Sequence, residues 1–284
     1  MSQPQHARLP VVVEPEWLAG HLDEVVVADV RWYLDGRSGR DAYLGGHLPG
    51  AVFVDVDTDL AAPASPRGGR HPLPSPEAFA RALGALGIGD ATPVVAYDDA
   101  GGSTAARLVW MLRVLGSPAA LLNGGVQAWR GPVEKGAVTP RPRSRTTRPW
   151  PAERLVDTDG VLAEAGSPDR LVLDARARER YTGAAPVPAD PRPGHVPGAR
   201  SAPWQDNLGP DGRFAPVERL RERFAALGAE RADTVTAYCG SGVTACHDLL
   251  ALEHAGFRNT RLYPGSWSAW GADPRLPAET GPGE

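Results

Sequence analysis

The chain has 284 residues, of which 42% are hydrophobic and 23% charged, with a formal net charge of -4 and a pI near 6.0. These values are typical of a globular protein and give no reason to expect a nucleic acid as partner. No apolar stretch approaches the roughly 20 residues that span a bilayer, and the N-terminus has no charged start leading into an apolar run. We therefore expect a cytoplasmic protein with no membrane and no nucleic-acid partner.

The chain contains two copies of one sequence pattern. Each copy has an apolar strand ending in Asp, a small residue and Arg, then a His-Leu/Val-Pro-Gly-Ala turn, a second strand, and a segment that begins with Gly and ends with Trp. The matching segments are 25–31 and 170–176, 47–51 and 195–199, 94–98 and 235–239, and 124–129 and 265–270. Because the landmarks keep the same order, we infer two copies of one domain. The turn histidines occur in both copies, which favours a structural role for them.

The order of the predicted elements indicates the fold class. Short strands rich in Val and Leu alternate with amphipathic segments. We predict helices at 76–86, 104–115, 217–227 and 244–254. The alternation predicts an α/β protein with two tandem domains, each a parallel sheet with helices on both faces. We place the domains at 8–131 and 152–284, joined by a Pro- and Arg-rich linker at 132–151.

Cys239 stands where a predicted strand ends, and it opens the loop Cys-Gly-Ser-Gly-Val-Thr-Ala before the helix at 244–254. The glycines let successive N–H groups converge on one anion, and the helix directs its positive end to the same place. Both effects favour thiolate over thiol, so we predict a nucleophile here, although most single cysteines are inert core residues. The N-terminal copy has Asp98 at this position. Aspartate cannot attack sulfur, so we expect that copy to be non-catalytic.

The second of the two cysteines is Cys246. Two cysteines are too few for a disulfide framework, or for a structural zinc site without suitably spaced histidines. Cys246 precedes His247, but adjacent residues of a helix face different directions. We therefore expect no metal, and nucleophilic chemistry at Cys239 requires no organic cofactor.

Four segments carry a resemblance to a known family. They are Tyr-Leu-Gly-Gly-His-Leu-Pro-Gly-Ala at 43–51, Gly-His-Val-Pro-Gly-Ala at 194–199, the loop from Cys239, and Tyr-Pro-Gly-Ser-Trp at 263–267. Through them the chain resembles the two-domain rhodanese-like sulfurtransferases over nearly its whole length. Within that family, the loop is similar to that of 3-mercaptopyruvate sulfurtransferases. Members that prefer thiosulfate carry basic residues directly after the cysteine.

The resemblance implies that sulfur passes from 3-mercaptopyruvate to Cys239, which becomes a persulfide while pyruvate is released. The persulfide then gives the sulfur to cyanide or to a thiol acceptor, such as a thioredoxin-like protein. Gly240 and Ser241 supply only small dipoles, whereas the thiosulfate dianion binds better beside cations. Thiosulfate:cyanide transfer and a non-enzymatic binding module remain alternatives. A Cys-X5-Arg phosphatase is disfavoured, because Ala245 stands where that chemistry needs arginine.

The resemblance also implies roles for individual residues. Arg180 would bind the substrate carboxylate, and Arg192 would replace a second arginine where this chain is shortened. Asp57 and His71 would relay a proton together with Ser241, since histidine has a suitable pKa of about 6.5 and aspartate can orient it. The loop residues expected to hold the transferred sulfur through their N–H groups are Gly240, Gly242, Val243 and Thr244.

Overall fold

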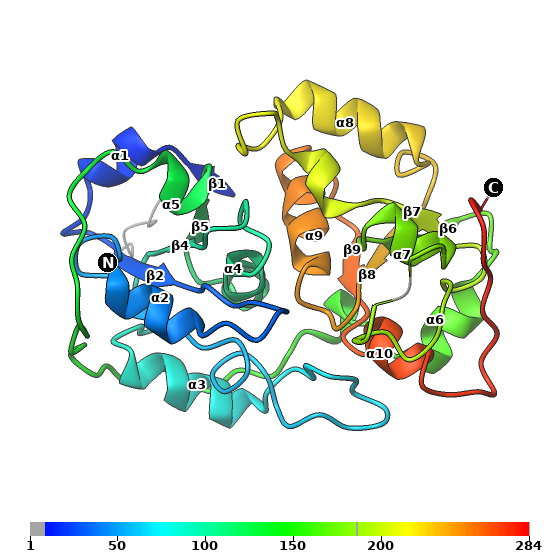
Figure 1. Cartoon of the computed structure of the whole chain (residues 1–284), viewed down its shortest axis with the longest axis horizontal. Helices are drawn as coiled ribbons and strands as arrows, with labels where there is room; N and C mark the ends of the chain where they lie inside the picture. Colours follow the sequence, from blue (N-terminus) through cyan, green and yellow to red (C-terminus); the bar gives the residue numbers. More distant parts are fainter. Residues whose placement is uncertain (1–8, 186, 284) are drawn as a thin grey trace, which may run out of the picture.

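The structure, a computed structural model, describes residues 9–185 and 187–283 (Figure 1). Residues 1–8, on which the prediction of no targeting segment rests, lie outside the described residues, as do residues 186 and 284. Within the described residues, no helix is long and apolar enough to cross a membrane.

The N-terminal half is built on a parallel sheet of five strands in the order β1-β5-β4-β2-β3. The strands are β1 (Val12–Val13), β2 (Val26–Asp29), β3 (Val52–Phe53), β4 (Val94–Tyr97) and β5 (Ala119–Leu122). The helices are α1 (Pro15–Ala19), α2 (Gly39–Gly45), α3 (Pro76–Ala85), α4 (Ala105–Val114) and α5 (Gly125–Ala128). Alternate residues of β4 enter opposite clusters, Val94 with α3 and α4, and Val95 with α1 and α5. Both faces of the sheet are therefore covered.

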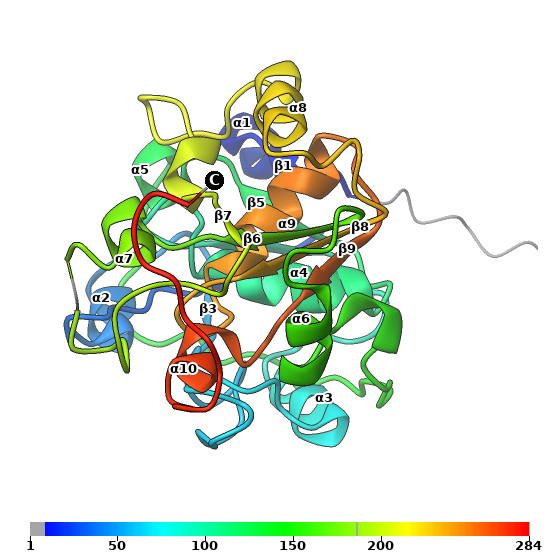
Figure 2. The ribbon, with the colours of Figure 1, turned by 90° about the vertical axis from the view of Figure 1, so that its right-hand side faces the viewer.

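The C-terminal half repeats this plan on a parallel sheet in the order β7-β6-β8-β9. The strands are β6 (Arg170–Asp174), β7 (Arg200–Ser201), β8 (Thr234–Tyr238) and β9 (Thr260–Leu262). The helices are α6 (Thr158–Glu164), α7 (Arg178–Thr182), α8 (Val217–Ala226), α9 (Ala245–His254) and α10 (Ser266–Trp270), with 3-10 turns η1 (Ala152–Arg154) and η2 (Trp204–Asn207). Figure 2 shows α8 and α9 on one face of the sheet and α6 and α10 on the other. The predicted fold class is confirmed.

The four helices predicted from periodicity, α3, α4, α8 and α9, agree with the structure to within one residue at each end. Local signals explain this agreement for α3. The Ser75 hydroxyl accepts a hydrogen bond from the Ala78 N–H, and Pro76 occupies the first turn, where its missing N–H has no consequence.

The repeated turn is held in the same way in both halves. His47 stacks on Tyr43, and its two ring nitrogens lie 2.9 and 3.0 Å from backbone carbonyl oxygens. His195 stacks on Tyr181, and its Nδ1 lies 2.8 Å from the Tyr181 carbonyl oxygen. These histidines satisfy buried backbone groups, which agrees with the structural role expected for them.

Helices α4 and α9 lie against each other where the two halves meet (Figure 1). One apolar cluster runs through this contact and joins the cores of both halves, from Phe79 on α3 to Phe224 on α8. The N-terminus of α9, where the Cys239 loop ends, is consequently held against the N-terminal half.

Candidate active site

The loop from Cys239 to Thr244 connects β8 to α9. Cys239 is buried, and its Sγ accepts a hydrogen bond of 3.1 Å from the Gly242 N–H. Gly242 has a φ of +76°, and a Cβ there would come within 2.7 Å of the Pro264 carbonyl oxygen. Only glycine fits this backbone, which turns the N–H toward the sulfur.

The repeated Gly-to-Trp segment anchors the start of this loop. The Cys239 N–H donates to the Ser266 hydroxyl at 3.2 Å, and the Cys239 carbonyl accepts from the Trp267 N–H at 2.9 Å. The Ser268 N–H donates to the Gly240 carbonyl, also at 2.9 Å. Ser266 adopts a positive φ of 51° that serine rarely occupies. The backbone on both sides of the sulfur is therefore fixed by α10.

Asp98 holds the equivalent loop of the N-terminal half. Its carboxylate is fully buried and accepts the N–H groups of four residues at 2.8–2.9 Å and the hydroxyl of Thr104 at 2.9 Å. The four N–H groups belong to Ala100, Gly102, Thr104 and Ala105. The loop that cradles an anion is thus already filled by its own side chain.

Ser241, His71 and Asp57 form one chain of hydrogen bonds that crosses between the halves. His71 Nδ1 lies 2.8 Å from the Ser241 hydroxyl, and its Nε2 lies 2.9 Å from the Asp57 carboxylate. A carboxylate only accepts, so Nε2 carries the hydrogen and Nδ1 accepts from the hydroxyl. The structure therefore brings together the three residues that the resemblance implied for proton relay.

Burial lowers the pKa of His71, and the charges of Arg107 and Arg70 lower it further, against the opposing effect of the Asp57 carboxylate. His71 is consequently neutral near pH 7. Trp32 was not predicted as part of this group. Its indole N–H donates to the second Asp57 oxygen at 2.9 Å, and its ring meets His71 edge-on at 5.4 Å.

Two guanidinium groups lie over Gly240. A Cβ on Gly240 would lie 2.8 Å from Nη2 of Arg180 and 3.3 Å from Nη2 of Arg70. Arg180 also holds the buried Asp190 carboxylate with two hydrogen bonds, of 2.6 and 2.8 Å. Burial lowers the pKa of Arg70, as does the Arg180 charge, while negative charge on Cys239 would raise it. Two cations therefore lie beside the loop, although no basic residue directly follows Cys239 in the sequence.

The sequence did not predict that Arg70 lies at this site. Arg192, which was predicted to bind the substrate, does not lie at Gly240 in the structure. The Arg192 guanidinium donates to the Leu276 carbonyl at 2.7 Å and lies 5.8 Å from the centre of the Trp267 ring. The one signal for Arg70 was its position directly before His71, in a segment already assigned to the site.

Within the described residues, the Gly242 N–H is the loop N–H group that donates to Cys239 Sγ. Val243 is buried, and Thr244 directly precedes α9 at the N-cap position, where its side chain makes no capping hydrogen bond. Cys246 lies one turn into α9, where its thiol donates to the Gly242 carbonyl at 3.4 Å. Burial raises the pKa of this second thiol to about 12, so it stays protonated near neutral pH.

A family model described as the Rhodanese-like domain matches two stretches of the chain, residues 14–132 and 157–273. The chain belongs to the rhodanese-like family. The first stretch contains the N-terminal sheet apart from β1, with Asp98 at its loop, and the second contains the whole C-terminal sheet, with Cys239 at its loop.

Relatives of this rhodanese-like chain span almost its whole length. A Pseudomonas aeruginosa protein named "Probable 3-mercaptopyruvate sulfurtransferase" is 46% identical over 93% of this chain and 96% of its own. A Mycobacterium tuberculosis protein that bears a thiosulfate sulfurtransferase name is 38% identical over 97% and 99%. The solved structure of 3-mercaptopyruvate sulfurtransferase from Leishmania major superimposes with a TM-score of 0.81 at 32% identity, covering 94% of this chain and 75% of that one. This rhodanese-like chain is a sulfurtransferase.

Proposed function

We propose that this sulfurtransferase takes sulfur from 3-mercaptopyruvate through a persulfide on Cys239 and passes it to a thiol or to cyanide. The observation that carries the proposal is the hydrogen-bonded chain from Ser241 through His71 to Asp57, beside the Cys239 loop. 3-Mercaptopyruvate has a proton on its sulfur and leaves as an enolate that needs one, whereas thiosulfate has no proton to move. A proton relay therefore favours the carbon-bound donor.

The proposed first stage balances without a cofactor. The Cys239 thiolate attacks the substrate sulfur, an S–S bond forms, and the C–S bond breaks with its electron pair on the pyruvate enolate. The proton of the substrate thiol passes to the Ser241 hydroxyl as that hydroxyl gives its own to His71 Nδ1. The same route run backwards delivers a proton to the enolate carbon. The products are pyruvate and a persulfide anion.

Arg70 and Arg180 are the proposed ligands of the substrate carboxylate. Both place Nη2 at Gly240, next to the nucleophile, and guanidinium groups recognise carboxylates through paired N–H donors. In the present structure Arg180 donates to Asp190. A bound carboxylate would then share Arg180 with Asp190, while Arg70 contributes the additional positive charge. Arg192 has no part in this proposal, because its guanidinium donates to the Leu276 carbonyl.

The loop N–H groups are the proposed support for the persulfide anion. The Gly242 N–H already donates to the sulfur, and those of Gly240, Val243 and Thr244 lie in the same loop at the positive end of α9. A thioredoxin-like protein is the proposed physiological acceptor. The expected cytoplasmic location agrees with this, since thiols stay reduced there.

Thiosulfate is the second candidate donor. Two cations at Gly240 suit a sulfonate as well as a carboxylate, and the Mycobacterium tuberculosis relative bears a thiosulfate sulfurtransferase name. The proton relay is the feature that thiosulfate transfer would leave unused.

The two donors can be compared directly. We expect kcat/KM with cyanide as acceptor to be higher for 3-mercaptopyruvate than for thiosulfate, and His71→Gln to reduce turnover of the first donor far more than of the second. Mass spectrometry should find one added sulfur, about 32 Da, on the peptide with Cys239, and none in Cys239→Ser. A preference for thiosulfate that His71→Gln leaves unchanged would contradict the proposal.

A further inference from the structure

Arg107 lies on α4 of the N-terminal half and is completely buried. Within the part of the chain that the structure describes, each hydrogen bond of its guanidinium goes to a backbone carbonyl. Nη1 donates to Gly242 at 2.9 Å, and Nε donates to Leu60 at 3.1 Å. Nη2 donates to Leu60 at 3.0 Å, to His71 at 2.8 Å and to Pro72 at 3.3 Å. In residues 9–185 and 187–283, none of its hydrogen bonds or ion pairs reaches a carboxylate. A permanent cation is thus buried without an acidic partner.

Burying a charge without a counter-charge is costly, and buried cations in proteins are normally paired. Burial lowers the pKa of Arg107, and the described groups whose negative charge would raise it are the thiols of Cys246 and Cys239. Cys246 is a neutral thiol near pH 7, because burial raises its pKa to about 12. Cys239 is therefore the remaining group whose negative charge, when it forms, would act on Arg107.

Gly242 connects the two groups. Its carbonyl accepts from Arg107, and its N–H donates to Cys239 Sγ. Arg107 also holds the His71 carbonyl, so one side chain positions both the nucleophile loop and the proposed base. These contacts cross between the halves, since Arg107 and Gly242 lie 135 residues apart in sequence.

We propose that Arg107 is a positioning residue of the sulfur-transfer reaction, which supplies from the non-catalytic half the buried positive charge that stabilises the thiolate and the persulfide of Cys239. The inference rests on the proposed function only in taking Cys239 as the nucleophile, and it is independent of which donor is used. Because the guanidinium is buried, salt does not screen its charge as it screens exposed cations.

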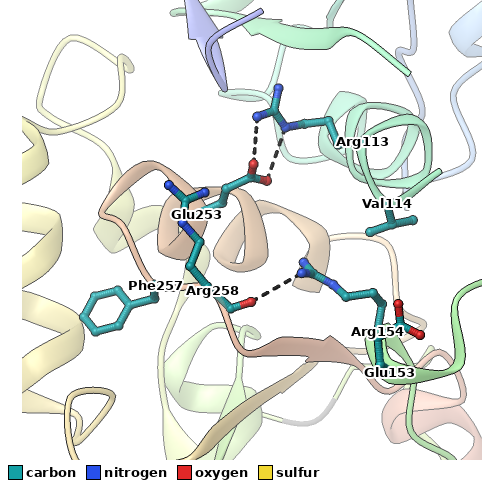
Figure 3. Close-up of a pocket in the computed structure, with 7 residues that line it drawn as sticks. All are labelled: Arg113, Val114, Glu153, Arg154, Glu253, Phe257 and Arg258. Atoms are coloured by element: carbon teal, nitrogen blue, oxygen red, sulfur yellow. Dashed lines mark hydrogen bonds and ion pairs between the residues drawn. The ribbon is translucent and has the colours of Figure 1, made fainter. Parts of the chain in front are cut away.

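Arg113 provides a matched control on the same helix. It is also a buried arginine that reaches the other half, but it holds the Glu253 carboxylate with hydrogen bonds of 2.7 and 3.2 Å (Figure 3). It also donates to the carbonyls of Leu9 and Ala119. Replacing Arg113 removes a buried charge and bonds between the halves, as replacing Arg107 does, without removing a charge that acts on Cys239.

The test measures the thiolate of Cys239 directly, with no sulfur donor present. In a Cys246→Ser background Cys239 is the single thiol, so ultraviolet absorbance against pH gives its thiolate midpoint, with Cys239→Ser as blank. Among residues 9–185 and 187–283, the other charged or titratable groups near the loop are Arg70, Arg180 with Asp190, and His71 with Asp57. They stay unchanged in the Arg107 variants. Circular dichroism checks that each variant is folded.

We expect Arg107→Met to raise the thiolate midpoint by about one to two pH units, which an opposite charge nearby typically contributes. Arg107→Lys, which keeps the charge, should raise it less, and Arg113→Met should leave it in place. An unchanged midpoint in folded Arg107→Met, or an equal rise in Arg113→Met, overturns the proposal. Because no sulfur donor is present, this measurement tests the role of Arg107 even if 3-mercaptopyruvate proves not to be the donor.

Arg107→Met could fail to fold, so a second variant tests the effect of the Arg107 charge on Cys239 without replacing Arg107. The double variant Arg70→Met, Arg180→Met removes the other two cations at the loop. A midpoint within about one pH unit of the native protein's supports the proposal, and a rise as large as the one expected for Arg107→Met overturns it.

Discussion

At the scale of single residues, Asp98 and Cys239 occupy the same position of two similar loops and give them opposite properties. The Asp98 carboxylate takes up four backbone N–H groups and one hydroxyl, so its loop is closed by an anion of its own. Within the described residues, the Cys239 sulfur accepts only the Gly242 N–H, so the other N–H groups of its loop are not taken up by its own side chain. The sequence predicted the loss of the nucleophile, but not that the carboxylate fills the loop.

This difference predicts that Asp98 stabilises the fold. Asp98→Ala leaves four buried or half-buried N–H groups without their acceptor, and we expect a loss of about 2–4 kcal/mol in the free energy of unfolding. Urea denaturation measures it, with the exposed Asp23→Ala as control. Catalytic parameters at 25 °C should stay close to those of the native protein. A change in stability no larger than that of the control contradicts the structural role.

His71 predicts a specific pH dependence. The base must be neutral to act, and burial lowers its pKa, so activity with 3-mercaptopyruvate should fall on the acid side only below pH of about 6.5. Asp57→Asn removes the carboxylate that opposes this lowering. The acid limb should therefore move to lower pH while the maximal rate drops, because the ring loses its fixed orientation.

The measurement is kcat/KM against pH for the native protein and for Asp57→Asn. His71→Gln should lose at least about a hundredfold of the maximal rate, the contribution expected of a general base. An acid limb that moves to higher pH in Asp57→Asn would show that the sign of the Asp57 effect on His71 is wrong.

At the scale of elements, the sequence predicted what local patterns encode. Helices α3, α4, α8 and α9 follow from apolar periodicity, and β8 from its apolar run before Cys239. Contacts between distant segments have no local signal. Arg70 was missed for this reason, because it reaches Gly240 from the other half of the molecule. Arg192 was selected instead because the resemblance pointed to its own segment of the chain.

The loop between β8 and α9 has two glycines with different physical roles. A Cβ on Gly240 would meet the ends of two flexible arginines, which can move. We expect Gly240→Ala to keep the stability of the protein and to raise KM for 3-mercaptopyruvate, because Arg70 and Arg180 are displaced. A Cβ on Gly242 would meet the rigid Pro264 carbonyl at a φ of +76°.

Gly242→Ala should therefore cost about 1–3 kcal/mol of stability and lower kcat, because the N–H that donates to Cys239 Sγ is turned away. Steady-state kinetics and thermal unfolding of both variants measure the two effects. Equal losses of stability in the two would contradict the assignment of different roles.

At the scale of the whole molecule, the site is shared between the halves. Cys239, Ser241 and Arg180 come from the C-terminal half, while residues 57, 70, 71 and 107 come from the N-terminal half. The repeat predicted two similar domains, but a repeat does not specify how its copies dock. The packing of α4 on α9 decides this, and it brings His71 to Ser241 across 170 residues of sequence. In the proposed mechanism, the half that lacks the cysteine thus contributes the proton relay as well as structural support.

This arrangement predicts that neither half transfers sulfur from 3-mercaptopyruvate alone. Residues 152–284 keep Cys239 but lose His71, Asp57 and the two arginines of the other half, so we expect a drop in turnover of at least about a hundredfold. Co-expressed with 1–151, they should copurify, because one apolar cluster joins both cores, and turnover should return. The same pair with His71→Gln in the N-terminal half should copurify and stay inactive. This control shows whether the N-terminal half supplies the proton relay or only stabilises the fold of the C-terminal half. Full activity of residues 152–284 alone would contradict a site built from both halves.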